Sequence, residues 1–221
     1  MNEGQPFIRW DWIIDNLDQI GRRLGEHVYM TLLAISIGFA ISFALAMLIR
    51  SRPGLYGPII GFSGILYAIP SVALFALLVP FTGLSVLSAE IALVSYTLVI
   101  LIRNIVTGLE GVPPDVIEAA VGMGYTPSQR LWRVELPIAL PVIVAGLRIA
   151  TVTTIGLVTI TTLIGAGGLG YLIVNTGIRR FFDTSTYTGV VLSVALAIAA
   201  DLLLLALQRR LTPWACARAE A

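Results

Sequence analysis

The chain has 221 residues, of which 57% are hydrophobic and 12% charged, and its mean hydropathy is +0.90. An average soluble domain is about 45–50% apolar and about 25% charged, so this composition excludes a disordered chain, an ordinary cytosolic enzyme and a nucleic-acid-binding domain. The net charge of +1 supplies no general attraction to an anionic polymer. A single cysteine, Cys216, and a single histidine, His27, leave no set of ligands for a disulfide framework, a CxxC site or a histidine-based metal site. We therefore expect no metal, no cofactor and no catalytic residues.

Residues 1–27 form a polar N-terminal segment that lacks the apolar core of a cleavable signal peptide. Apolar residues recur in it at helical spacing, which predicts an amphipathic helix. They are Ile13, Leu17, Ile20, Leu24 and Val28. The pattern fits equally a helix in the membrane interface and a solvated helix that packs on the rest of the protein.

We expect an all-α integral membrane protein with five transmembrane helices between residues 28 and 208, because a spanning helix needs about 20 mostly apolar residues. The five stretches that meet this length are residues 28–49, 58–80, 86–105, 138–164 and 187–207. Pro70 and Pro141 predict kinks or tilt in the second and fourth.

Arginine placement predicts the orientation. Arginines are more numerous in the segments that follow the first, third and fifth stretches than in the others, and cytoplasmic segments carry the excess of basic residues. This favours an N-terminus outside the cell and a cytoplasmic tail at residues 209–221.

The segment between the third and fourth spans, residues 106–137, carries clear helix boundary signals. Pro114 suits the first position of a helix, and Gly124 suits its C-terminal cap. Thr126 and Pro127 then suit the N-cap and first position of a second helix. The segment is therefore predicted to be a helix–turn–helix on the cytoplasmic face, able to transmit force from a soluble partner.

A set of residues in this segment stands at a fixed spacing: Glu118, Ala119, Ala120, Gly124, Leu136 and Pro137. The segment resembles the EAA loop of bacterial ABC importer permeases, whose pattern is E-A-A-x3-G-x9-I-x-L-P, with Val134 in the place of Ile. Five spans with this loop after the third resemble the methionine-importer type of permease core. Residues 67–74, 130–148 and 163–170 are most similar to the osmoprotectant branch.

The resemblance implies a permease subunit of an ATP-driven importer for a quaternary-ammonium osmoprotectant: glycine betaine, choline, carnitine or proline betaine. It implies a multi-pass protein of the bacterial cytoplasmic membrane that couples to an ATPase through the six loop residues just given. The implied partners are a cytosolic ABC ATPase dimer, a second permease subunit of the same or a sibling chain, and an extracytoplasmic substrate-binding protein. The chain has no G-x4-G-K-[ST] motif, so ATP hydrolysis is expected in a separate chain and this subunit is not an enzyme.

Two other hypotheses stay open. The same fold would serve an importer of methionine or another small amino acid. A passive channel or membrane scaffold is the alternative from another class, although such a protein has no need of the loop pattern.

Gly165, Gly167 and Gly170 spell G-x-G-x-x-G. A dinucleotide site requires a strand before these glycines and a helix after them, whereas here they follow a membrane span. We therefore expect a tight turn at the outer membrane face.

Threonines gather on one arc of the fourth span, counted at about 100° per residue. Such a stripe either lines a water-filled path or hydrogen-bonds to neighbouring helices. The candidates for a translocation path are Thr151, Thr154 and Thr162, together with Tyr67 and Tyr96, because aromatic faces hold quaternary ammonium groups.

Arg148 and Asp201 are charged residues expected within the fourth and fifth spans, where an unpaired charge is costly. We favour a structural ion pair between them. The alternative is a proton or ion relay, which an ATP-driven importer does not need.

Overall fold

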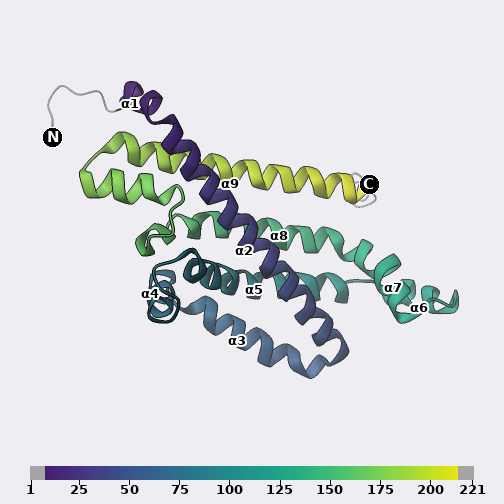
Figure 1. Ribbon diagram of the computed structural model, residues 1–221. Coiled ribbons are helices and arrows are strands. Elements are labelled where there is room, and N and C mark those ends of the chain that lie inside the picture. Colours follow the sequence, from purple (N-terminus) through teal and green to yellow (C-terminus); the bar gives the residue numbers. More distant parts are fainter. Residues whose placement is uncertain (1–7, 214–221) are drawn as a thin grey trace.

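The computed structural model describes residues 8–213, and the regular structure in this part of the chain is entirely helical (Figure 1). Residues 1–7 of the predicted N-terminal segment and residues 214–221 of the predicted tail, Cys216 included, lie outside the described residues. Four stretches are long and apolar enough to cross a membrane, and a bent helix pair provides a possible fifth. The four are Leu17–Ser51, Val86–Glu110, Pro127–Val158 and Asp183–Leu211.

The long helices run back and forth between the two ends of the molecule (Figure 1). The α-helices are α1 (Trp10–Asp15), α2 (Leu17–Ser51), α3 (Tyr56–Ala68), α4 (Ser71–Thr82), α5 (Val86–Glu110), α6 (Pro114–Gly122), α7 (Pro127–Arg130), α8 (Leu136–Val158) and α9 (Asp183–Leu211). Short 3-10 or π-helical turns are η1 (Pro53–Leu55), η2 (Leu131–Glu135), η3 (Thr161–Ile164), η4 (Tyr171–Gly177) and η5 (Ile178–Arg180). In Figure 1, α1 and α4 lie at one end, and α6, α7 and the C-terminal end of α9 lie at the other.

Helix α2 is longer than the first expected span, because residues 17–27 continue it without a break. Ile20 on this extension is buried and packs with Leu169 and Leu172. The boundary that the sequence suggests at residue 27 is therefore not a break in the helix.

The second expected span, residues 58–80, is two helices rather than one. Helices α3 and α4 meet at an angle of 96°. Pro70 causes the break, since proline lacks an N–H group and disfavours the helical conformation of the residue before it. Ile69 is accordingly extended, with φ −67° and ψ 129°. The Tyr96 hydroxyl donates a hydrogen bond of 2.5 Å to the Ile69 carbonyl at the break, and the expectation of one kinked span is corrected to a broken pair.

Helix α8 ends at Val158, before the expected end of the fourth span at residue 164. The five residues 158–162 are all β-branched, and such side chains are less suited to a helix. The chain turns into η3, and Gly165 directly after it is in the left-handed region at φ 79°. Thr162 therefore leaves the helix, and its predicted place on a common helical arc with Thr151 is wrong.

Helix α5 is the centre of the core and packs against α2, α3, α4 and α8. Small residues allow membrane helices to approach closely. A Cβ added at Gly146 of α8 would lie 2.3 Å from the Asn104 Cβ of α5, and one at Gly38 of α2 would overlap Thr97 of α5. These two glycines therefore set the spacing of the core helices.

Candidate functional site

Helix α6 ends in a turn that only a few residue types tolerate. The Tyr125 N–H donates to the Ala120 carbonyl at 3.1 Å, and the Gly124 N–H donates to the Val121 carbonyl at 2.9 Å. These two bonds form a Schellman motif, whose C′ residue adopts a left-handed conformation. Gly124 has φ 80°, so the predicted role of Gly124 as the end of this helix is confirmed.

Helix α7 starts with a complete capping box. The Thr126 hydroxyl accepts from the Gln129 N–H at 3.3 Å, and the Gln129 side chain accepts from the Thr126 N–H at 2.9 Å. Two otherwise free backbone N–H groups are thereby satisfied reciprocally. The prediction of Thr126 as N-cap and Pro127 as first residue is confirmed, while Gln129 is a partner that the sequence analysis missed.

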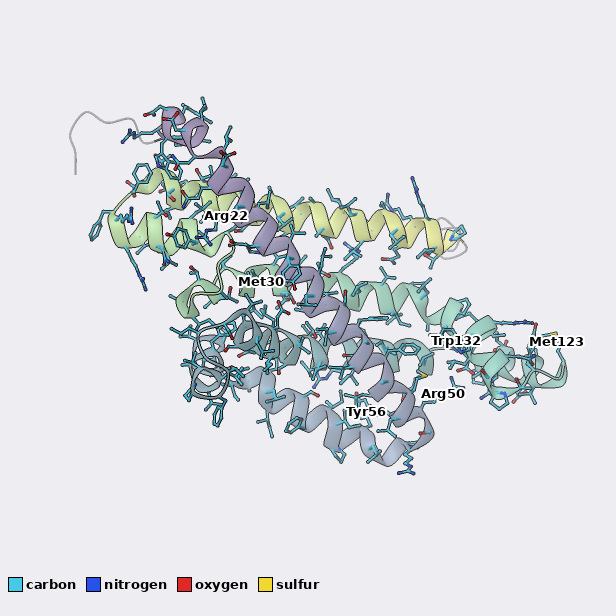
Figure 2. The ribbon with its side chains drawn as sticks, viewed as in Figure 1. Arg22, Met30, Arg50, Tyr56, Met123 and Trp132 are labelled. Carbon is cyan, nitrogen blue, oxygen red and sulfur yellow. The ribbon has the colours of Figure 1, made fainter. Side chains whose placement is uncertain are left out.

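The predicted coupling residues of α6 differ in exposure. Glu118 and Ala119 are exposed, whereas Ala120 is buried. Met123, at the turn, is 70% exposed, and Figure 2 shows it at the far tip of the protruding α6–α7 segment. A Cβ added at Gly124 would meet nothing within 4 Å. The segment therefore presents a small-residue face and an apolar tip to the exterior.

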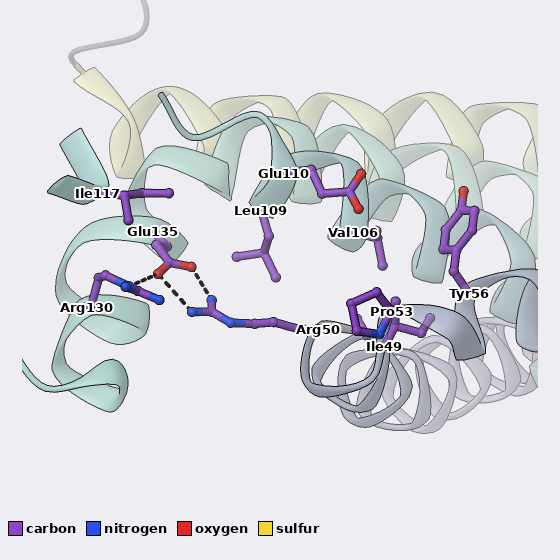
Figure 3. A pocket seen from close by; sticks show the side chains of 11 residues that line it. Ile49, Arg50, Pro53, Tyr56, Val106, Leu109, Glu110, Ile117, Arg130 and Glu135 are labelled. Atoms are coloured by element: carbon purple, nitrogen blue, oxygen red, sulfur yellow. Dashed lines mark hydrogen bonds and ion pairs between the residues drawn. The ribbon is translucent and has the colours of Figure 1, made fainter. Parts of the chain in front are cut away.

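A buried carboxylate ties this protruding segment to the first long helix. Glu135 at the end of η2 has a side chain only 5% exposed. Arg50, at the end of α2, binds it through both terminal nitrogens, one of them 2.9 Å from Oε1, and the Arg130 Nε donates to the same Oε1 at 2.7 Å (Figure 3). Charged donors satisfy the buried carboxylate, so α2, α7 and the start of α8 are joined at one point.

Glu135 has no predicted role, although it stands inside the loop motif. A carboxylate directly before a long apolar run needs a partner when it is buried. That signal could have identified Glu135, but its partner Arg50 lies 85 positions away in the chain.

A pocket of about 300 Å³ lies beside this ion-pair network, between the ends of α2 and α5, η1 and α6. Figure 3 shows Arg130 and Glu135 at one side of the pocket and Pro53 and Tyr56 at the other. The lining residues are Ala46, Ile49, Arg50, Pro53, Tyr56, Val106, Leu109, Glu110, Ile117, Arg130 and Glu135. Because α6 contributes Ile117 to this wall, a displacement of α6 reaches the network directly.

The last two motif residues have a different place from those of α6. Leu136 and Pro137 are half-buried at the start of α8. Leu136 packs on the apolar cluster that contains Ile143 and Ile102. The first four motif residues therefore belong to α6 and the turn that ends it, and the last two belong to the start of α8, which connects the segment to the core.

The structure brings Tyr67 and Tyr96 together, with ring centroids 5.8 Å apart in an edge-to-face arrangement. Tyr67 is 43% exposed, whereas Tyr96 is buried. Thr151 donates to the Leu147 carbonyl of its own helix at 2.7 Å. Thr154 and Thr162 are buried.

Arg148 and Asp201 form a two-pronged ion pair between α8 and α9. The Arg148 Nε lies 2.8 Å from Oδ1 of Asp201, and Nη2 lies 2.8 Å from Oδ2. The two side chains that the sequence analysis placed together are in contact, in the geometry that makes arginine–carboxylate pairs strong.

The glycine-rich turn after η3 binds side chains of α2. Gly165, Gly167 and Gly168 all have positive φ. The Gly168 N–H donates to Glu26 at 3.0 Å, and the Leu169 N–H donates to Nδ1 of His27 at 3.3 Å. The predicted tight turn is confirmed. The N–H groups of Gly168 and Leu169 already bind side chains of the same chain.

The family described as "Binding-protein-dependent transport system inner membrane component" matches residues 34–213, and the chain belongs to it. The protein is thus a multi-pass inner-membrane permease component, a transport subunit and not an enzyme. The resemblance seen in the loop motif is confirmed.

Two characterised relatives are similar over almost the whole chain. The osmoprotectant import permease protein OsmW of Salmonella typhimurium is 39% identical over 207 residues, covering 91% of this chain and 96% of that protein. The glycine betaine/carnitine/choline transport system permease protein OpuCB of Bacillus subtilis is 35% identical, covering 96% and 95%. Among solved structures, an inward-facing MetNI methionine ABC transporter matches with a TM-score of 0.79 and 28% identity, covering 87% of this chain and 96% of that chain.

Proposed function

We propose that this chain forms the membrane path of an ATP-driven importer for a quaternary-ammonium osmoprotectant, in the group of glycine betaine, choline, carnitine and proline betaine. The names of the two relatives support this substrate class. The observation that carries the proposal is the protruding α6–α7 segment, which exposes Glu118 and Ala119 beside a glycine turn. A passive channel has no use for such a protrusion.

The end of the molecule that carries α6 faces the cytoplasm in this proposal, with the N-terminus outside and the C-terminus inside. Arginines support the assignment, because Arg50, Arg130 and Arg133 belong to the end that carries α6 and α7, and Arg209 and Arg210 end α9 beside it (Figure 1). Basic residues concentrate on the cytoplasmic side of membrane proteins.

The α6–α7 segment is the docking element for a cytosolic ATPase dimer. Glu118, Ala119 and Gly124 form the contacting face, and Met123 enters the partner surface. Movement of the docked segment passes through Glu135 to the end of α2, and through η2 to Leu136 and Pro137 at the start of α8. A second permease subunit completes the path, and a substrate-binding protein delivers the substrate from outside.

Tyr67 and Tyr96 are the path residues that we favour for contact with the quaternary ammonium group, since aromatic faces attract such cations. The exposed ring of Tyr67 supports this role. Thr151, Thr154 and Thr162 are the proposed polar residues of the same path. The pair Arg148–Asp201 is proposed as a structural link between α8 and α9.

Methionine or another small amino acid is the second candidate substrate, because the MetNI permease shares the fold. A substrate panel distinguishes the two. We expect glycine betaine or choline, delivered by the cognate binding protein, to stimulate ATP hydrolysis by the reconstituted complex. Stimulation by methionine alone would move the chain to the second substrate class.

The docking proposal is tested with a matched pair of variants. Met123→Glu places a charge on the tip of the α6–α7 segment, and Leu84→Glu places one at the opposite end of the molecule on a residue of almost equal exposure, 71% against 70%. We expect the first variant to lose the copurified ATPase and the second to keep it. Equal ATPase recovery from both variants would contradict docking at this segment.

A further inference from the structure

A second pocket, of about 560 Å³, opens where α2, η2, α8 and the end of α9 meet. Every lining side chain is apolar or aromatic, and six of them define its walls: Phe39, Phe43, Trp132, Leu140, Ile143 and Leu211. The rings of Phe39 and Phe43 stack with centroids 6.2 Å apart, and Phe43 and Trp132 lie 6.1 Å apart. The volume falls within the range of roughly 300–1,000 Å³ that is typical of small-molecule sites.

Exposed arginines neighbour two of the lining residues in the sequence. Arg133 follows Trp132 in the chain, and Arg209 and Arg210 precede Leu211. All three arginines are exposed, and none of them makes an ion pair with another residue of the 8–213 range. They differ in this from Arg50 and Arg130, whose charges Glu135 neutralises.

We propose that this pocket binds one anionic phospholipid. An acyl chain lies along the aromatic wall, and the phosphate is held by Arg133, Arg209 and Arg210. The walls belong to helices that are long and apolar enough to span the membrane, so a lipid has access to them from the bilayer. Basic pockets between spanning helices on the cytoplasmic side are suited to anionic headgroups, and a tryptophan such as Trp132 is favoured at that depth.

The site gives the lipid a mechanical role. Trp132, Leu136 and Pro137 line the pocket, and they connect the α6–α7 segment to α8. A lipid in the pocket therefore braces this connection against α2 and α9. The proposal rests on the membrane orientation proposed above and not on the identity of the transported substrate.

The test measures lipid retention by the full transporter complex. The complex is reconstituted with equal amounts of phosphatidylglycerol and phosphatidylcholine, extracted in mild detergent and examined by native mass spectrometry. We expect the permease to retain phosphatidylglycerol preferentially. Two variants should each reduce this retention several-fold: Arg209→Gln combined with Arg210→Gln, which removes charge, and Leu140→Trp, which fills the pocket and leaves the charge unchanged.

Arg179→Gln combined with Arg180→Gln is the matched control, because these arginines are also adjacent and exposed but lie in η5, outside the pocket. Retention should match that of the unchanged protein. The proposal is overturned if both lipids are retained equally, or if neither the charge variant nor the pocket variant lowers retention.

Inorganic phosphate and the chain's own tail are other candidate occupants of the pocket, and each would change lipid retention in a different way. Excess inorganic phosphate should not displace the lipid; displacement would mean that the arginines recognise phosphate alone and that the apolar wall has no part. Removal of residues 214–221 should leave retention unchanged. Increased retention after this truncation would show that the chain's own tail fills the pocket, and would overturn the lipid assignment.

Discussion

Two glycine-containing turns at opposite ends of the molecule are held by different kinds of contact, local in one and long-range in the other. The α6–α7 turn is exposed, and its bonds connect residues within five positions of one another, as in the Thr126–Gln129 capping box. The turn after η3 is buried, and its amides bind Glu26 and His27, which lie 142 positions away. Both turns use glycines with positive φ.

The difference fits the proposal that the α6–α7 segment moves with a partner while the turn after η3 stays fixed. A turn that is folded by its own residues keeps its shape when it is displaced, so it suits a segment that a partner pushes. A turn that needs side chains from another helix would lose its partners if it moved. The turn after η3 therefore suits a fixed link between α2 and η4. Substitutions in the buried turn should therefore reduce stability, and substitutions in the α6–α7 turn should mainly reduce coupling.

The largest expected loss of stability comes from Gly170→Ala. A Cβ at this position would lie 1.8 Å from the Thr159 carbonyl oxygen, which belongs to the backbone. Such overpacking should cost about 3 kcal/mol or more of the free energy of unfolding, measured by thermal unfolding of the purified complex. Gly156→Ala is the control, since a Cβ there meets nothing within 4 Å; an equal loss in both variants would refute the steric explanation.

Glu135→Gln should also reduce stability. Removing one member of a fully buried ion pair costs about 3–5 kcal/mol, and because Arg50 and Arg130 are about one quarter exposed we expect roughly 2 kcal/mol. Transport should fall further than stability alone explains, because the link between the α6–α7 segment and α2 is lost. Glu110→Gln, an exposed carboxylate of the same pocket, should change neither quantity.

His27→Phe should destabilise the buried turn while keeping the volume filled. Nδ1 of His27 accepts from the Leu169 N–H, so Nε2 carries the proton and donates to the Ile155 carbonyl at 3.1 Å. The variant leaves both backbone groups unpaired, at about 1–3 kcal/mol for each buried group. Hydrogen exchange should accelerate at Leu169 and leave the α6–α7 segment unchanged; faster exchange at both ends would remove the distinction between them.

Gly124→Ala should have the smallest effect on stability and a clear effect on coupling. The added Cβ meets open space, but a left-handed conformation costs a residue other than glycine about 1–2 kcal/mol, so the turn opens locally. We expect an unchanged unfolding temperature and a loss of substrate-stimulated ATP hydrolysis. Gly122→Ala lies two residues earlier within α6, also in open space, and should preserve coupling; a similar loss in both would deny the turn its role.

Local signals predicted the α6–α7 segment well. Pro114, Gly124 and Thr126 each act through neighbours within a few positions, so their roles as helix start, helix end and N-cap follow from the sequence. The same reasoning placed a proline kink near Pro70, but the size of the break depends on Tyr96, which binds the Ile69 carbonyl from another helix.

Long-range partners explain what the sequence analysis missed. The pairing of Glu135 with Arg50 and of His27 with the glycine turn depends on how distant helices pack. The extension of α2 through residues 17–27 likewise depends on Ile20 packing against Leu169 and Leu172. No local pattern encodes these contacts.

Cross-linking tests whether the α6–α7 segment binds the ATPase. Cys216 is replaced with Ser, and Ala119→Cys on α6 is compared with Leu84→Cys at the opposite end, both in the assembled complex with a short bifunctional reagent. We expect a cross-link from Cys at position 119 to the ATPase, at a yield that changes when ATP binds, and none from position 84. A complex that cross-links equally from both positions, or from neither, would contradict ATPase binding at this segment.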